Sequence, residues 1–190
     1  KFGRYAGEGD PVKSTGLFSA YRVKEMRLEN SFTCTVLFDA PLADSDPGQF
    51  VMAWLPEIGE KPFSISGNDP LALTVADVGP FSHAFNQLSE GERVWIRGPL
   101  GKGFSITSQP SLLVGGGYGA APLSLLAKHL RLKDVPVAVA LGARSAEALM
   151  MVPVFESLGC QVYLATEDGS AGDMGLVTRA ANQACLDMDL

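Results

Sequence analysis

The stretch Leu112–Leu130, "LLVGGGYGAAPLSLLAKHL", places four glycines within five consecutive positions, between an apolar run and a segment with helical periodicity. Pro122 suits the first turn of such a helix, where its missing N–H costs little. The apolar positions that recur at i, i+3, i+4 and i+7 are Leu123, Leu126, Ala127 and Leu130. The stretch therefore predicts a strand, a glycine-rich turn and a helix, in that order.

The glycines of this turn fit a dinucleotide-binding pattern. Gly115, Gly117 and Ala120 match G-x-G-x-x-A in the strand, turn and helix context that the motif requires. Absent side chains let a diphosphate approach the backbone, and a helix N-terminus offers free N–H groups. A tight turn without any ligand is the alternative. Arg144 and Ser145 stand where an ordinary Rossmann domain has an acidic residue, which argues against that particular fold.

The residues after Ser108 alternate between strand-like and helix-like segments. "SLLVGG", "PVAVALG" and "QVYLAT" are almost continuously apolar, as are strands buried on both faces of a parallel sheet. Helical segments separate or follow them at 121–130, 153–159 and 175–188. This alternation predicts βαβ units and a small α/β parallel-sheet domain over residues 108–190.

The preceding half of the chain has a different pattern. Six β-rich segments, broken by turn residues, indicate an antiparallel barrel or sandwich: 20–28, 31–38, 48–55, 61–66, 71–78 and 93–99. A helical insert at 82–88 has Ser82 as its expected N-cap. We predict a two-domain α+β fold, with a six-stranded antiparallel β-barrel at 21–107 ahead of the α/β domain. Residues 1–20 are interpreted as a leader, a loose arm or partly a tag.

Composition excludes several classes of function. The net charge of −6 and the pI near 4.9 argue against a protein that binds nucleic acid or an anionic membrane surface. No apolar run approaches the roughly 20 residues of a membrane span, and no secretory signal is recognisable. Cys34, Cys160 and Cys185 lie far apart without metal-ligand spacing. We expect free thiols, no metal site and a cytoplasmic location.

Six short segments together resemble a known superfamily. "KPFSIS", "VGPFSHAF", "GPLGKGF", "GGGYGAAP", "GARS" and "TEDGS" occur in the order found in ferredoxin–NADP reductase-like proteins. Over about Tyr21–Met188, the chain most resembles the electron transfer subunits of dihydroorotate dehydrogenase B, with their relatives in sulfide dehydrogenases and hydrogenases. The resemblance implies a flavoprotein oxidoreductase with FAD on the barrel and NAD(P)H on the α/β domain. It also implies a part in electron transport and pyrimidine biosynthesis.

The resemblance implies FAD contacts along two strands and one turn of the barrel. Lys61 replaces the usual arginine, keeping the charge but losing the bidentate fork. Phe63 would face the flavin ring and Ser64 its N5 atom, while Phe81 and Ser82 replace a usual Gly–Thr pair. The implied FAD-binding residues are Lys61, Pro62, Phe63, Ser64, Thr74, Val75, Ala76, Phe81 and Ser82.

The α/β domain carries the implied nicotinamide nucleotide site. Arg144 lies where the adenosine end would sit, and it could accept a 2′-phosphate or stack, so NADH and NADPH both stay open. Glu167 follows the third strand, next to Asp168. The implied residues are Gly115, Gly116, Gly117, Tyr118, Gly119, Ala120, Arg144 and Asp168. No catalytic side chain is expected, because the cofactors carry the chemistry.

The family's pattern continues beyond the last residues of this sequence. A further strand and a four-cysteine segment holding a [2Fe–2S] cluster belong to an intact relative and have no counterpart here, so we expect a truncated chain or a relative that lost its cluster. The implied partner is a catalytic oxidoreductase subunit, dihydroorotate dehydrogenase-like or other, in a heteromeric complex. The alternatives are a diaphorase-type subunit of a bifurcating ferredoxin:NADP oxidoreductase, sulfide dehydrogenase or hydrogenase, and a non-catalytic interaction subunit.

Overall fold

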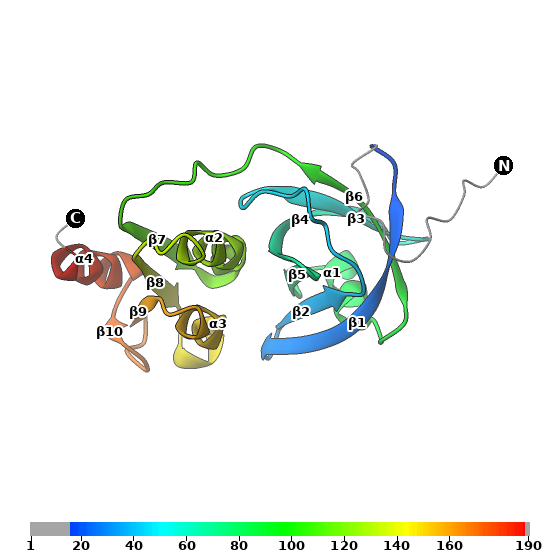
Figure 1. The fold of residues 1–190 in the computed structure, drawn as a ribbon. Helices are drawn as coiled ribbons and strands as arrows, with labels where there is room; N and C mark the ends of the chain where they lie inside the picture. Colours follow the sequence, from blue (N-terminus) through cyan, green and yellow to red (C-terminus); the bar gives the residue numbers. More distant parts are fainter. Residues whose placement is uncertain (1–15, 189–190) are drawn as a thin grey trace.

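The computed structural model describes residues 16–188 and shows two domains side by side (Figure 1). One is a β-barrel and the other a parallel sheet with helices on both faces, as predicted. Most of the proposed leader lies outside the described residues. Ser19 and Ala20, which we had assigned to the leader, pair with Ile96 and Trp95 and so form the start of the barrel.

The barrel is closed and entirely antiparallel, in the strand order β1-β2-β5-β4-β3-β6. Alternate residues point inward, so Val36, Ile65, Leu73 and Val75 form its apolar core. Closure leaves no free sheet edge. The strands are β1 (Ser19–Asn30), β2 (Thr33–Phe38), β3 (Phe50–Leu55), β4 (Gly59–Asn68), β5 (Leu71–Ala76) and β6 (Arg93–Leu100).

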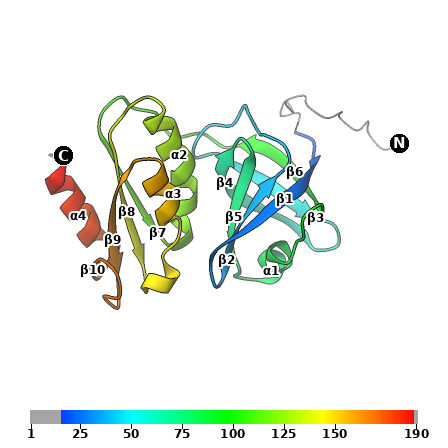
Figure 2. The ribbon, with the colours of Figure 1, turned by 60° about the horizontal axis from the view of Figure 1, so that its bottom comes forward.

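One short helix, α1 (Pro80–Asn86), packs against the barrel core (Figure 2). Its Phe81 and Phe85 are buried and lie 5.8 Å and 5.3 Å from the Phe63 ring of β4. Ser82 was expected to be the N-cap, but it lies in the first turn. Its hydroxyl accepts the N–H groups of Val78 and Gly79 and donates to the Gly79 carbonyl, so Ser82 stabilises the helix start from inside the helix.

The second domain has a parallel sheet in the order β10-β9-β8-β7. Helices α2 and α3 cover the face toward the barrel, and α4 covers the other face (Figures 1 and 2). Its elements are β7 (Ser111–Gly116), the 3-10 turn η1 (Gly117–Ala120), α2 (Ala121–Arg131), β8 (Val137–Ala143), η2 (Ala146–Ala148), α3 (Val152–Ser157), β9 (Gln161–Thr166), β10 (Asp173–Met174) and α4 (Val177–Asp187).

Helix α2 joins the two domains, because it buries side chains in both cores. Leu125 packs with the barrel core, whereas Leu126 and Leu130 pack with the core of the sheet. Between these faces, the buried Ser124 hydroxyl lies 2.7 Å from the carbonyl oxygen of Ser66 in β4. The contact of α2 with β4 therefore determines how the sheet is placed against the barrel.

We expect Ser124→Ala to lower the free energy of unfolding by about 1–3 kcal/mol, because it leaves a buried carbonyl of β4 without its partner. Ser157→Ala is the matched control. Ser124 Oγ also lies 2.7 Å from the carbonyl oxygen of Ala121, three residues before it. Ser157 makes the same kind of contact in α3, with the Val154 carbonyl at 2.7 Å, but at an exposed position, and its loss is expected to cost about 0.5 kcal/mol or less. Urea denaturation of both variants measures the difference, and equal effects would argue against a structural role for the α2–β4 contact.

Across residues 16–188, none of the helices combines the length and the apolar character needed to cross a membrane. The same residues contain no group of three or more His, Cys, Asp or Glu side chains placed to hold a metal ion.

Candidate functional site

The glycines between β7 and α2 serve different physical purposes. A Cβ atom on Gly115 would lie 3.0 Å from the Cα atom of Ala120 and from a methyl group of Leu123, so this glycine allows the turn to pack closely on the strand. Gly117 has φ +51°, a conformation that favours glycine. Gly116 and Gly119 are open, since a Cβ on Gly116 would meet only the Gly142 oxygen, at 4.0 Å. At Gly116, which lines the cavity described next, this open space permits a ligand to approach the backbone.

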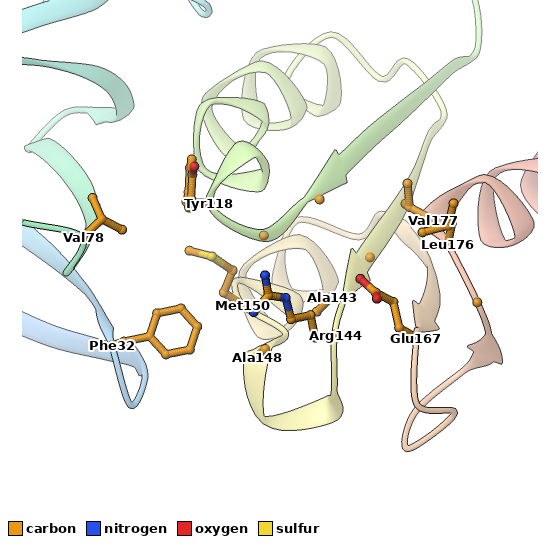
Figure 3. Close-up of a pocket in the computed structure, with 14 residues that line it drawn as sticks. Phe32, Val78, Tyr118, Ala143, Arg144, Ala148, Met150, Glu167, Leu176 and Val177 are labelled. Atoms are coloured by element: carbon orange, nitrogen blue, oxygen red, sulfur yellow. The ribbon is translucent and has the colours of Figure 1, made fainter.

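A cavity of about 490 Å³ lies at the carboxyl edge of the parallel sheet and extends to the barrel (Figure 3). Its size falls within the usual range of small-molecule sites. The barrel contributes one wall and the sheet the other, and most of the lining side chains are apolar. The lining residues are Phe32, Val78, Gly116, Gly117, Tyr118, Gly142, Ala143, Arg144, Ala148, Met150, Glu167, Gly175, Leu176 and Val177.

Two charged side chains face this cavity from adjacent strand ends. Arg144 follows β8 and Glu167 follows β9, and both are exposed. Their backbones stay aligned because Glu167 N donates to the carbonyl of Ala143 at 3.0 Å. Within the described part of the chain, neither side chain forms a salt bridge, so a cationic and an anionic group remain available to a polar ligand. This edge is where open α/β sheets bind ligands.

The predicted site residues of the second domain divide into two groups. Gly116, Gly117, Tyr118 and Arg144 line the cavity together. Gly115, Gly119, Ala120 and Asp168 do not line it. Gly115 and Ala120 pack against each other, as described above, and Asp168 organises the neighbouring loop.

The Asp168 carboxylate accepts two hydrogen bonds from Ser170, from its N–H at 3.0 Å and from its hydroxyl at 2.6 Å. The Ser170 hydroxyl in turn accepts the N–H of Ala146 at 2.7 Å, which ties the loop after β9 to the loop after β8. The hydrogen bonds from the Ser170 side chain and backbone lower the pKa of Asp168 below its ordinary value of 3.8.

This lowered pKa predicts a pH-dependent effect of Asp168→Asn. A depressed folded-state pKa stabilises the fold above the unfolded-state value near 3.8, and the stabilisation is lost as pH falls through the lower folded-state pKa. The variant should melt below the wild type at neutral pH, and the difference should shrink as pH falls below 3.8. Thermal melting across this pH range measures it, and a difference that does not vary with pH would contradict the assignment.

The residues implied for FAD on β4 include three with exposed side chains: Lys61, Pro62 and Ser64. Phe63 is half-buried, and its ring packs inward on Phe81 at 5.8 Å with an interplanar angle of 30°. The aromatic side chains that would approach a flavin therefore pack with each other and with the barrel core.

The other residues implied for FAD are buried. Thr74 lies 2.8 Å from the Thr35 hydroxyl and donates to Ser66 Oγ at 3.0 Å. Thr35, Ser66 and Thr74 are all buried, so these hydroxyls hydrogen-bond to one another rather than to solvent. Val75 points into the core, and Ala76 is 8% exposed. Phe81 and Ser82 are each 6% exposed. None of these five residues lines the cavity.

The apolar walls of the cavity come from residues that no sequence motif indicated. Phe32 stands in the tight turn between β1 and β2, and Val78 stands between β5 and α1. Met150 and Leu176 contribute from loops of the second domain. The one feature of the sequence that could have indicated Phe32 and Val78 is that each is an apolar residue outside the strands, in a turn or connection. Phe32 and Val78 are 46% and 77% exposed, and such exposure within a concave surface suggests binding rather than folding.

The barrel followed by a parallel sheet, with a cavity between them and a glycine turn at its edge, is the fold of ferredoxin–NADP reductase-like proteins. Among solved structures, the chain resembles the NADH-dependent reduced ferredoxin-NADP oxidoreductase, with TM-score 0.78 and 29% identity over 86% of this chain and 62% of that one. A ferredoxin reductase of carbazole 1,9a-dioxygenase shares the fold, with TM-score 0.75 and 23% identity over 88% of this chain and 57% of that one.

The curated relatives within this superfamily are electron transfer subunits. The chain is 44% identical over 132 residues to the probable dihydroorotate dehydrogenase B (NAD(+)), electron transfer subunit of Thermococcus kodakarensis, covering 70% of this chain and 55% of the relative. It is 36% identical over 157 residues to the protein of the same name from Methanocaldococcus jannaschii, covering 83% and 60%. The chain thus spans little more than half the length of these relatives. No protein-family model matches it.

Proposed function

We propose that the chain is the flavin- and nicotinamide nucleotide-binding part of an electron transfer subunit, which passes electrons between NAD(P)H and a partner oxidoreductase as in dihydroorotate dehydrogenase B. The observation that carries the proposal is the cavity at the carboxyl edge of the sheet, one wall of which comes from the barrel. Such a cavity can bring a nucleotide held on the sheet to a cofactor held on the barrel. We also propose a cytoplasmic location, in keeping with three free cysteines.

The residues of the sheet fit a dinucleotide. Gly116 leaves space for a diphosphate at the strand end, and Gly117 turns the chain beside it. Arg144 supplies positive charge for a phosphate, and Glu167 supplies an acceptor for ribose hydroxyls. The apolar walls limit the access of water to the rings of a bound nucleotide.

Fewer side chains of the barrel are placed to contact FAD than the resemblance implies. Lys61 can neutralise a phosphate, while Pro62 and Ser64 present exposed groups along the same strand. The backbone of Thr74–Ala76 and of the Val78–Gly79 turn completes the proposed contact surface. When bound, FAD would supply hydride acceptance from the nicotinamide and release of electrons one at a time.

The absorption spectrum of the purified protein tests this proposal, followed by anaerobic addition of NADH and NADPH in separate samples. We expect flavin bands, and we expect them to bleach with at least one nucleotide, which also gives the cofactor preference. A colourless protein that cannot be reconstituted with FAD would refute the proposal and favour the non-catalytic interaction subunit.

A second candidate is a subunit of a bifurcating ferredoxin:NADP oxidoreductase. Its support is the similarity to the NADH-dependent reduced ferredoxin-NADP oxidoreductase, at TM-score 0.78. Reconstitution with a dihydroorotate-oxidising subunit distinguishes the two. Flavin reduction by dihydroorotate in that complex supports the first candidate. Flavin reduction by NADPH or by reduced ferredoxin in the matching complex, and not by dihydroorotate, supports the second.

A further inference from the structure

Phe32 lies at the tip of the β1–β2 hairpin, on the barrel wall of the cavity (Figure 3). It is 46% exposed, although it is a large aromatic side chain beside an apolar cavity. Across the cavity stand Met150 and Arg144, from loops of the other domain. A phenylalanine ring left open in this way can bury considerable apolar area against a ligand.

The backbone of Phe32 is held by hydrogen bonds on both sides. Its N–H donates to the side-chain oxygen of Asn30 at 3.1 Å, and its carbonyl accepts the N–H of Asp77 at 2.7 Å. The Asn30 amide also donates to the Ala148 carbonyl of the second domain at 3.4 Å. The hairpin tip is thereby fixed both to the barrel and to the loop after β8, which also lines the cavity.

These contacts make Phe32 a preorganised aromatic surface. Its backbone does not need to be ordered on binding, and its ring has only two side-chain torsions, so little conformational entropy is lost when a ligand covers it. No packing partner within the described residues accounts for the exposed part of the ring, whereas the buried phenylalanines of the barrel stack on one another. An exposed aromatic ring of this kind is suited to pack against a second planar ring.

We propose that Phe32 packs against a planar ring of the nicotinamide dinucleotide held on the second domain, and that it thereby sets the affinity for that nucleotide. The inference rests on the proposed function and adds a binding residue contributed by the barrel. The ring is either the adenine or the nicotinamide, which share this chemistry.

Isothermal titration of the FAD-loaded protein with NAD⁺ and with NADP⁺ tests the proposal, because the oxidised nucleotides bind without reducing the flavin. Phe32→Ala should weaken binding of the preferred nucleotide about tenfold. Phe32→Leu, which keeps apolar volume but not the ring, should weaken it about fivefold, and Phe32→Trp should stay within about twofold of wild type. In Phe32→Trp, nucleotide binding should also quench the fluorescence of the new indole, a readout that does not depend on activity.

Phe104→Ala is the matched control, because Phe104 is 44% exposed and does not line this cavity. Its nucleotide affinity should equal that of wild type. Titrations with AMP and with nicotinamide mononucleotide then identify the ring, since Phe32→Ala should weaken the binding of one of these two ligands. Unchanged affinity of Phe32→Ala for both dinucleotides, with wild type binding normally, would overturn this inference alone. Wild-type protein that binds FAD and no dinucleotide would overturn the proposed function as well.

Discussion

Replacing Phe85 with alanine is expected to lower the free energy of unfolding by about 3–5 kcal/mol, the largest effect on stability that we predict. Phe85 is fully buried, and its ring lies 5.3 Å from that of Phe63 and 6.0 Å from that of Phe81. Truncation opens a cavity where β4 meets α1 and removes both ring contacts. Urea denaturation followed by circular dichroism measures the loss.

The same substitution should also weaken FAD binding, because Phe63 lies on the strand that carries Lys61 and Ser64 and packs directly on Phe85. Phe104→Ala again serves as the control, since removal of an exposed ring is expected to cost less than about 1 kcal/mol. A loss below about 1.5 kcal/mol for Phe85→Ala would show that α1 is not anchored by this cluster.

Gly116→Ala is expected to weaken nucleotide binding tenfold or more, or about 1.4 kcal/mol, without a cost in stability. Gly116 has an extended backbone, with φ −114° and ψ 132°, that any residue adopts. The added Cβ would meet only the Gly142 oxygen at 4.0 Å, so the protein accommodates it. The methyl group would instead project where a diphosphate must approach the backbone.

Gly119→Ala separates this effect from a general change in the turn. Gly119 lies three residues further along the same turn, has open space around its Cβ position and does not line the cavity. Its nucleotide affinity should stay within about twofold of wild type. Titration of both variants, together with their thermal midpoints, gives the comparison. Equal losses of affinity, or a lower midpoint for Gly116→Ala, would contradict a role for Gly116 in ligand approach.

Local sequence pattern predicted the architecture because each element carries its own signal. Six β-rich segments broken by turn residues indicated barrel strands over the first half, and six strands form the closed barrel. Continuous apolar runs indicated parallel strands buried on both faces. β7 to β9 are parallel, but only β8 is largely buried, since Val114 of β7 is 45% exposed and β9 begins with exposed and half-buried residues. The glycines at 115–117 marked the turn from β7 into the following helix. Each of these features depends on residues that are close together in the sequence, and a local sequence pattern can therefore predict it.

The site was only partly predictable. Gly116, Gly117, Tyr118 and Arg144 could be inferred, since strand ends at the carboxyl edge of a parallel sheet meet in space. Phe32 lies more than 80 positions before Gly116 in the chain, and no local pattern relates the two. Their meeting depends on how the second domain is placed against the barrel.

That placement is a property of the tertiary structure, and it rests on side chains with no distinguishing pattern. Ser124 on one face of α2 contacts the Ser66 carbonyl, and Leu125 enters the barrel core beside it. Thr74 is buried, and its hydroxyl, which a local pattern would leave free for a ligand, is bonded to Thr35 and Ser66 of the neighbouring strands. The sequence alone therefore determined the strands, the helices and the glycine turn. The cavity between the domains, and the side chains free to face it, were decided by packing between residues distant in the chain.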